Sequence, residues 1–236
     1  MVRRTVTSLV MLFLLIGQCP LKAQIAISFM AGPNYSYFFQ SKSDYAAEAS
    51  PGFGFDVGLQ VKAGDNHLLS FKALVGYSLQ TSSIKLTSFL LNDFNYHTYL
   101  EGKYQLSNII IYPQFQVNLL EKKTLYLGIG PFFQFRVAGN GKGTYYGYTW
   151  EGTPYSGNEI MSMSTLFNKI NYGPGMSIGY QKICIGKICL FVELRELWMV
   201  NNYFQDDKKG NGWSSKAIWY NLMTSFNIGF DFYRSK

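Results

Sequence analysis

The sequence predicts an all-β fold: an eight-stranded antiparallel up-and-down transmembrane β-barrel, with a ten-stranded barrel as the alternative. Three observations support this fold class. Apolar residues alternate with small or polar residues along eight segments, so each predicted strand has an apolar face and a polar face. The connections between these segments alternate between short and long. Aromatic residues make up 17% of the 236 residues and charged residues only 15%, against about 25% charged residues in an average soluble domain.

The N-terminal region, residues 1–23, has the composition of a secretory signal peptide. Arg3 and Arg4 precede an apolar stretch from Leu9 to Ile16, and Leu21-Lys22-Ala23 follows as the cleavage region. The apolar stretch is too short to cross a membrane as a helix, which requires about 20 apolar residues. We therefore expect export across the inner membrane, cleavage of residues 1–23 and one barrel domain over residues 24–236.

Each of the eight predicted strands places apolar side chains at alternate positions. In the second strand, for example, Phe53, Phe55 and Val57 alternate with Gly54, Asp56 and Gly58. The predicted strands cover residues 25–37, 52–62, 69–80, 108–119, 125–137, 170–182, 190–200 and 217–232.

The connections sort by length. Residues 64–67, 120–123 and about 184–188 are expected to be tight turns, and about 38–50, 82–103, 139–167 and 201–215 to be long loops. Short turns at one end and long loops at the other are typical of an outer-membrane barrel, with the turns and both chain ends in the periplasm.

One stretch departs from the simple alternation. Phe94, Tyr96, Thr98 and Leu100, three of them apolar or aromatic, occupy even-numbered positions. From Ile109 onward the apolar residues occupy odd-numbered positions. A β-bulge within residues 102–108 would explain the switch. Residues 84–100 then form either a hairpin about Asn92-Asp93 that projects beyond the membrane, or an extra strand pair that makes ten strands.

The polar faces of the strands are expected to line the interior. They are rich in Gly, Ser, Asn and Gln, which suit the filled interior of eight strands, so the apolar faces meet lipid. A soluble lipocalin-like barrel, with its apolar face inside, is the alternative. Aromatic residues near the outer ends of the strands favour lipid, since they would form a girdle at the membrane interface. They are Tyr35, Tyr37, Phe53, Tyr77, Phe133, Phe135, Tyr172, Trp198 and Tyr220.

The interior is also expected to hold charged side chains of both signs. Because four cations and three carboxylates can neutralise one another, they predict a closed, salt-bridged lumen and disfavour an open pore. The members of this predicted charge network are Asp56, Lys62, Lys72, Arg136, Glu193, Arg195 and Asp231.

Two further features are candidate sites. Cys184 and Cys189 flank Ile-Gly-Lys-Ile and would form a disulfide in the oxidising periplasm, provided that a bulge at the turn corrects their opposite face assignments.

The third outer loop combines glycines with aromatic residues, a composition suited to adaptable recognition. This candidate binding surface consists of Tyr145, Tyr146, Tyr148, Trp150 and Tyr155. Lysines of the outer loops, Lys42, Lys85, Lys142, Lys208 and Lys209, could meet lipopolysaccharide phosphates.

Several short segments are similar to those of a known group of proteins. They are Tyr126 to Pro131, Tyr172 to Tyr180 and Glu193-Leu194-Arg195. The closing strand, with Asn227, Gly229, Phe230 and Phe232, looks like a barrel-assembly signal, although residues 233–236 follow the aromatic residue at which many relatives stop.

With these segments the chain resembles the outer-membrane β-barrel proteins of Bacteroidota that are labelled porin-family or PorT-like. The resemblance implies a small barrel with a structural or interaction role, in contact with outer-membrane lipids, lipopolysaccharide and the barrel-assembly machinery. Other envelope or secretion proteins are candidate partners. A PorT-like component of type IX protein secretion is the alternative function that the resemblance implies.

The sequence offers little catalytic chemistry. Its two histidines, His67 and His97, lie far apart in predicted connections, so neither a metal cluster nor a Ser-His-Asp arrangement is evident. We expect no enzyme activity, catalytic residue, cofactor or metal site, and no nucleic-acid partner because the mature chain is only mildly basic. A lipid A-modifying enzyme, the less favoured alternative, would depend on His97 with Thr98 and Glu101.

Overall fold

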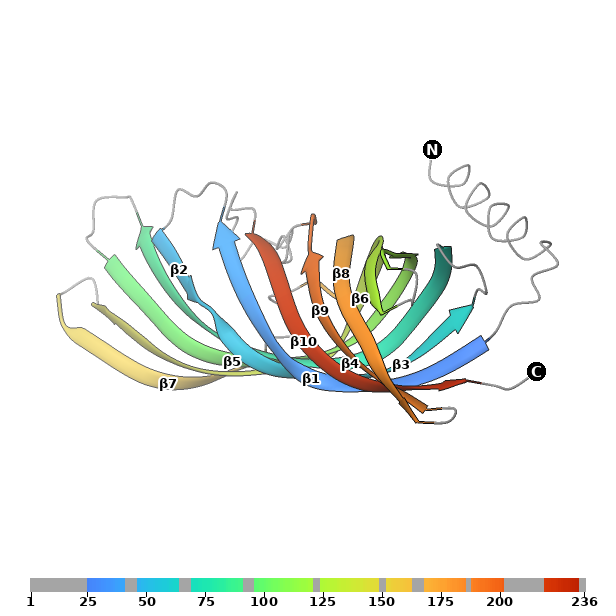
Figure 1. The fold of residues 1–236 in the computed structure, drawn as a ribbon. Helices are drawn as coiled ribbons and strands as arrows, with labels where there is room; N and C mark the ends of the chain where they lie inside the picture. Colours follow the sequence, from blue (N-terminus) through green and yellow to red (C-terminus); the bar gives the residue numbers. More distant parts are fainter. Residues whose placement is uncertain are drawn as a thin grey trace.

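Antiparallel strands make up almost all of the described chain (Figure 1). The computed structural model describes residues 25–40, 46–63, 69–90, 96–120, 124–148, 152–162, 168–185, 188–201 and 219–233. The predicted signal peptide, residues 1–23, lies outside this part. Within it, no helix is long and apolar enough to cross a membrane.

Eight strands close into a barrel. Each pairs in antiparallel fashion with two neighbours, and the pairing of the first strand with the last completes the ring. The barrel strands are, in their order around the ring, β1 (Ile25–Gln40), β3 (Gly52–Ala63), β4 (Leu69–Leu90), β5 (Tyr96–Asn118), β6 (Leu125–Tyr148), β8 (Ile170–Ile185), β9 (Ile188–Trp198) and β10 (Trp219–Tyr233). This closure confirms the eight-stranded prediction.

The short connections lie at one end of the barrel. They join β3 to β4, β5 to β6 and β8 to β9, at the end where β1 begins and β10 finishes, with Ala26 opposite Tyr233. The strand ends on either side agree with the predicted positions of the turns, because strand alternation stops there, whereas residues 64–68, 121–123 and 186–187 of the turns lie outside the described residues.

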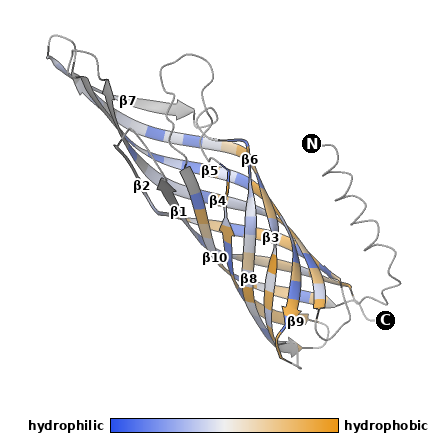
Figure 2. Ribbon diagram, turned by 90° about the horizontal axis from the view of Figure 1, so that it is seen from above, coloured by the Kyte–Doolittle hydropathy of each residue, from blue (hydrophilic) through white to orange (hydrophobic). Residues whose placement is uncertain are grey.

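Apolar side chains cover the outside of the barrel and polar side chains fill much of the inside. Outward residues such as Leu59 and Ile129 are 58% and 61% exposed, whereas inward residues such as Ser28 and Gln60 are 1% exposed. Figure 2 shows hydrophobic colouring along the barrel wall and more hydrophilic colouring towards β2 and β7. The lipocalin-like alternative, which needs the apolar face inside, is therefore wrong.

The aromatic residues of the predicted girdle lie on the outward face. Their exposure allows contact with the membrane interface, where aromatic side chains are favoured. Those with large exposure are Tyr35, Tyr37, Phe53, Tyr77, Phe133, Tyr172 and Trp198, whereas Phe135 is only partly exposed. The side chain of Tyr220 lies outside the described part.

Three strands continue beyond the barrel and form an additional sheet. β4 and β5 stay in one register from Leu69 opposite Val117 to Leu90 opposite Tyr96, and β6 pairs with the far part of β5. Two short strands, β2 (Ala46–Ser50) and β7 (Pro154–Ser162), pair with the far parts of β4 and β6. We call this five-stranded structure the extension sheet; it comprises residues 46–50, 81–90, 96–106, 139–148 and 154–162.

The extension sheet corrects part of the loop prediction. Residues 82–103 and 139–167 are mostly strand and not long loops, whereas the hairpin interpretation of residues 84–100 is right. The reason is that each strand finds a pairing partner beyond the membrane, so the ladder continues even though water surrounds it. Exposed polar residues such as Lys103 and Gln105 replace the apolar outward face, so the pattern of a lipid-facing strand stops there.

A register shift occurs next to the predicted position, between Ser107 and Asn108, but β6 and not β5 carries the additional residue. Ser107 of β5 pairs with Ala138 and Asn108 pairs with Arg136, so Val137 of β6 is the additional residue. β5 keeps its faces throughout, because Tyr104 and Leu106 are buried like Asn108. The expectation of a bulge within residues 102–108 of β5 was wrong because these apolar side chains fill the interior and do not meet lipid.

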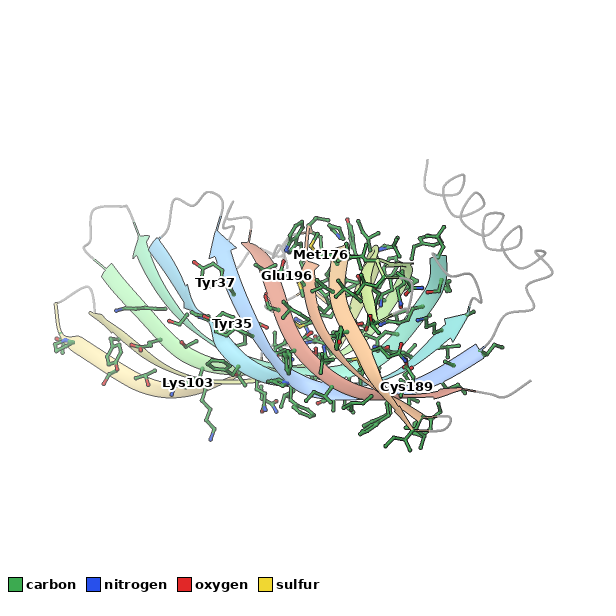
Figure 3. The ribbon with its side chains drawn as sticks, viewed as in Figure 1. Tyr35, Tyr37, Lys103, Met176, Cys189 and Glu196 are labelled. Atoms are coloured by element: carbon green, nitrogen blue, oxygen red, sulfur yellow. The ribbon has the colours of Figure 1, made fainter. Side chains whose placement is uncertain are left out.

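The turn between β8 and β9 contains a second irregularity. The register shifts between Gln181 and Ile183, which makes Lys182 an additional residue and places Cys184 directly opposite Cys189. This is the bulge that the face assignments of the two cysteines required. Cys189 is disulfide-bonded, and its position at the end of the hairpin is labelled in Figure 3.

We predict that the barrel tolerates deletion of Val137. Val137 and Ala138 both face outward, so removing one of them eliminates the bulge and leaves every other side chain on its present face. The variant should keep the heat-modifiable gel mobility of a folded barrel. Deletion of Ile129, which is regularly paired, inverts the faces on one side of the cut and should prevent assembly. Equal damage by the two deletions would contradict this assignment of the bulge.

Candidate functional site

Glu193 lies at the centre of the lumen and joins three other side chains. It is 1% exposed, pairs with the ammonium group of Lys72 on β4, and accepts a hydrogen bond of 2.5 Å from Arg195 on its own strand β9. The hydroxyl of Tyr126 on β6 donates to the same carboxylate at 2.9 Å. We call Lys72, Tyr126, Glu193 and Arg195 the lumen cluster.

Aromatic rings surround the two cations of the lumen cluster. The ammonium of Lys72 lies 5.0 Å from the ring centre of Tyr126 and 5.7 Å from that of Phe191, and the guanidinium of Arg195 lies 5.7 Å from that of Tyr112. These are cation–π distances, and such contacts gain strength when water is excluded. The rings therefore partly replace the hydration that the cations lose inside the barrel.

Glycines of β8 provide the space for these rings. A Cβ atom at Gly179 would overlap the ring of Tyr126, and one at Gly175 would contact the ring of Tyr112. Tyr126 is in register with Gly179 on the adjacent strand, so its ring occupies the space that a side chain at this position would fill. This pairing of tyrosine and glycine explains why the interior combines very large residues with very small ones.

The two remaining interior aspartates are held by neutral donors. Asp231 on β10 accepts hydrogen bonds from Ser28 and, at 2.6 Å, from Gln181. Asp56 on β3 accepts a hydrogen bond of 2.5 Å from the side-chain amide of Asn34. Both carboxylates are buried, so these hydrogen bonds offset part of the cost of removing them from water.

The seven predicted network residues thus divide into groups. Lys72, Glu193 and Arg195 form the two described ion pairs, while Asp56 and Asp231 are bound by amides and a hydroxyl. Lys62 is half-buried with its ammonium 5.9 Å from the ring centre of Tyr126. Arg136 is half-buried next to the β6 bulge, and its backbone amide donates to Lys169.

Sequence reasoning did not identify the large apolar residues of the interior. They share the inward face with the polar residues, and their exposure is 1% or less; they are Leu74, Leu106, Phe132, Leu197 and Met223. The side-chain amide of Gln80 lies 2.8 Å from the sulfur of Met223, so polar and apolar side chains of the interior contact each other here. Alternation could not reveal them, because single apolar residues on a polar face do not change its period.

Little free space remains in the lumen. A cavity of about 10 Å³ towards the end with the short turns is sufficient for about one water molecule. Its lining comprises Gln60, Lys62, Lys72, Gln116, Tyr126, Gln181, Phe191 and Asp231. Together with the buried apolar side chains, it gives the described lumen the character of a packed core.

Candidate catalytic or metal-binding groups do not gather in the described structure. In the described ranges, no group of three or more His, Cys, Asp or Glu residues could hold a metal ion. His97 lies on β5 in register with Phe89, and Glu101 is exposed on the same strand. His67 lies outside the described residues.

The candidate aromatic binding surface belongs to the extension sheet. Tyr145, Tyr146 and Tyr148 lie on β6, and Tyr155 lies on β7 opposite Gly147. Tyr146 is 47% exposed and is in register with Tyr99 of β5. Trp150 lies outside the described residues. The aromatic residues are thus arranged on a paired sheet instead of a loop.

The predicted assembly signal occupies the strand that closes the barrel. Asn227 is buried inside and donates a hydrogen bond of 3.1 Å to Ser225. Gly229 faces the ring of Phe191, which a Cβ atom would overlap. Phe230 and Phe232 are exposed outside, where β10 pairs with β1.

One charged residue faces outward within the apolar band. Glu196 on β9 lies between the exposed side chains of Leu194 and Trp198, and its register partners are Met176 and Thr224. Figure 3 labels Met176 and Glu196 on adjacent strands. The alternation of β9 could have identified Glu196, since it shares the parity of Leu194 and Trp198.

Comparison with solved structures finds small outer-membrane proteins at low sequence identity. OprG of Pseudomonas aeruginosa is 10% identical, with 89% of this chain and 96% of that chain covered and a TM-score of 0.46. Ail of Yersinia pestis is 10% identical, with 89% and 99% covered and a TM-score of 0.38. Comparison with curated proteins returns no match.

A family model gives the assignment that these distant structures leave open. The model, described as an outer membrane protein beta-barrel domain, matches residues 18–205, which is most of the chain and includes seven of the eight barrel strands and both short strands. Its description agrees with the closed barrel and the outward apolar band described above. The chain therefore belongs to the family of outer-membrane proteins defined by this β-barrel domain.

Proposed function

We propose that this outer-membrane barrel has a structural or interaction role and no open wide pore. The observation that carries the proposal is the filled lumen, in which the lumen cluster connects β4, β6 and β9 across the interior. A wide pore needs a continuous water-filled path lined by polar groups. The buried apolar side chains, which share the inward face with the polar ones, argue against such a path in the described lumen.

The extension sheet supports the interaction part of the proposal. In this sheet the strands remain paired beyond the lipid-facing band. Aromatic and charged side chains are exposed on it, including Tyr146 and Glu101. Tyrosines provide large contact areas at a low cost in conformational entropy, which suits recognition. A barrel that is closed inside and elaborated outside is better suited to contact with other molecules than to transport.

A PorT-like role in type IX secretion is a narrower form of the interaction role. In such a role the turns and the extension sheet would serve as docking surfaces for other envelope proteins. We treat it as an alternative to be decided by experiment, as we do contact with the barrel-assembly machinery through Asn227, Gly229, Phe230 and Phe232.

We predict that the purified protein does not conduct ions in planar lipid bilayers. The reason is that Phe132 and Leu197 are fully buried across the lumen. Replacing both by glycine should be sufficient to admit ions, whereas Phe133→Ala on the lipid-facing side should not. Steady conductance steps from the unchanged protein, at a level comparable to an open porin measured in parallel, would overturn the proposal of a closed lumen.

We also predict that Glu193→Gln strongly destabilises the barrel. The substitution removes the carboxylate that pairs directly with both Lys72 and Arg195, and breaking a buried ion pair from one side typically costs about 3–5 kcal/mol. Denaturant unfolding in lipid vesicles measures the change. Glu196→Gln, on the same strand but facing lipid, is the matched control and should cause no loss of stability. A Glu193→Gln variant within about 1 kcal/mol of the unchanged protein would contradict this role of Glu193.

A deletion strain separates the structural role from the secretion role. We expect the proteins in its culture supernatant to match those of the parent strain and of a complemented strain. Loss of secreted proteins that complementation restores would instead support the secretion alternative and direct attention to the extension sheet and the turns.

A further inference from the structure

The outward face of the extension sheet carries a group of exposed cations. Lys85 on β4, Lys103 on β5 and Lys142 on β6 are all exposed. In Figure 3 the side chain of Lys103 extends away from the sheet. Because residues in register share a face and alternate residues along a strand share it too, the three lysines lie on the same side of the sheet.

Two of these lysines are placed in an unfavourable pairing. Lys103 is directly opposite Lys142 in the β5–β6 register, and like charges in this position destabilise a sheet. The other register neighbours in this row are Ser83 and Ile160, neither of which is acidic. The nearest carboxylate in register on this face, Glu101, lies opposite Lys85 in a different row. The row of Lys103 and Lys142 therefore contains no carboxylate of its own.

Lys85 provides a comparison within the same face. It is directly opposite Glu101, which is exposed, so its register partner has the opposite charge. Glu48 of β2 is in register with Lys85 on its other side, so this row contains two carboxylates and one lysine, whereas the Lys103–Lys142 row contains two lysines and no carboxylate. A bound anion would compensate the positive charge of the Lys103–Lys142 row. It would gain less from the Lys85–Glu101 row, where a carboxylate is already present.

The position of the pair relative to the membrane indicates the source of the anion. Along β5 the outward apolar side chains of the barrel begin at Ile109, and Lys103 precedes Ile109 by six residues, towards the extension sheet. At a rise of about 3.4 Å per residue and a strand tilt of about 40°, this places Lys103 about 15 Å beyond the last exposed apolar side chain of its strand. That level lies outside the hydrocarbon, where the sugars and phosphates of lipopolysaccharide surround an outer-membrane barrel.

The face is also continuous with the lipid-facing surface below it. The outward residues of the same strands run from Tyr77 and Ile109 through Ser107 to the lysines, and the hydroxyl of Tyr77 donates to Ser107 at 2.7 Å. A molecule anchored in the outer leaflet can therefore rest on the barrel wall and reach the lysine pair. A dissolved anion gains no such support.

We propose that Lys103 and Lys142 together bind a phosphate group of lipopolysaccharide in the outer leaflet. Two ammonium groups in adjacent strands can donate to one phosphate, and these charge-assisted hydrogen bonds replace the repulsion between the lysines. The site adds a specific partner to the interaction role. It rests on the placement of the chain in the outer membrane and is independent of whether the lumen is closed.

Binding of purified lipopolysaccharide to the detergent-solubilised full chain tests the proposal. The probes are lipopolysaccharide with a phosphorylated core, the same material after enzymatic dephosphorylation, and inorganic phosphate. We expect the double variant K103A/K142A to raise the Kd for the phosphorylated form about tenfold or more, which corresponds to about 1.4 kcal/mol per factor of ten. K85A, which removes the lysine with a carboxylate opposite, is the matched control and should change the Kd much less.

A charge-reversing variant adds a readout that a purely structural role would not produce. K142E replaces the like-charged pair with an opposite-charged pair, so it should raise the denaturation midpoint in the absence of lipopolysaccharide while weakening lipopolysaccharide binding. Heat-modifiable mobility of each variant establishes that it is folded. The lumen proposal is tested separately by conductance of the same preparations, so failure of one does not imply failure of the other.

Three results would overturn the proposal. Equal binding of the phosphorylated and dephosphorylated probes would exclude phosphate recognition. Equal Kd values for the unchanged protein and K103A/K142A would exclude the lysine pair. Saturation by inorganic phosphate with no preference for lipopolysaccharide would make the site a general anion site in place of a lipopolysaccharide site.

Discussion

The requirement that every backbone amide and carbonyl be paired inside a membrane is the constraint on which this structure depends. Lipid offers no hydrogen-bond partner, so a sheet can cross it only when its first and last strands join. Here β1 and β10 meet that requirement over nearly their full lengths. The outward apolar face, the even number of barrel strands and the location of both barrel ends on the side of the short turns are consequences of this closure.

Closure also creates the conditions under which the lumen cluster forms. Eight strands enclose a space narrow enough for side chains to fill, and charges placed there lose most of their water. Glu193 compensates for this by contacting Lys72, Arg195 and Tyr126 at once, while the rings of Tyr126 and Tyr112 lie against glycines of β8. The charged cluster and the glycine pattern are thus two parts of one packing solution, because the tyrosine rings that contact the charged groups need the space that the glycines leave.

The two bulges and the extension sheet show how the same strands serve different surroundings. Val137 shifts the faces of β6 where the strand leaves the lipid-facing band, and Lys182 aligns the ends of β8 and β9 at their short turn. In the extension sheet the strand pairing continues, with exposed polar side chains on its outward face. The exposed surface formed there is the part of the molecule available to other components of the envelope.

The sequence by itself determined the strand period, the number of barrel strands, the outward direction of the apolar faces and the positions of the short turns, because all of these depend on neighbouring residues. Only the tertiary structure decided which contacts form across the barrel. Lys72 and Glu193 are 121 positions apart and meet because the ring closes, and Lys103 lies opposite Lys142 because of the bulge at Val137. Register between strands depends on non-local pairing, in which a single additional residue reverses the faces of all that follow, and local alternation does not contain that information.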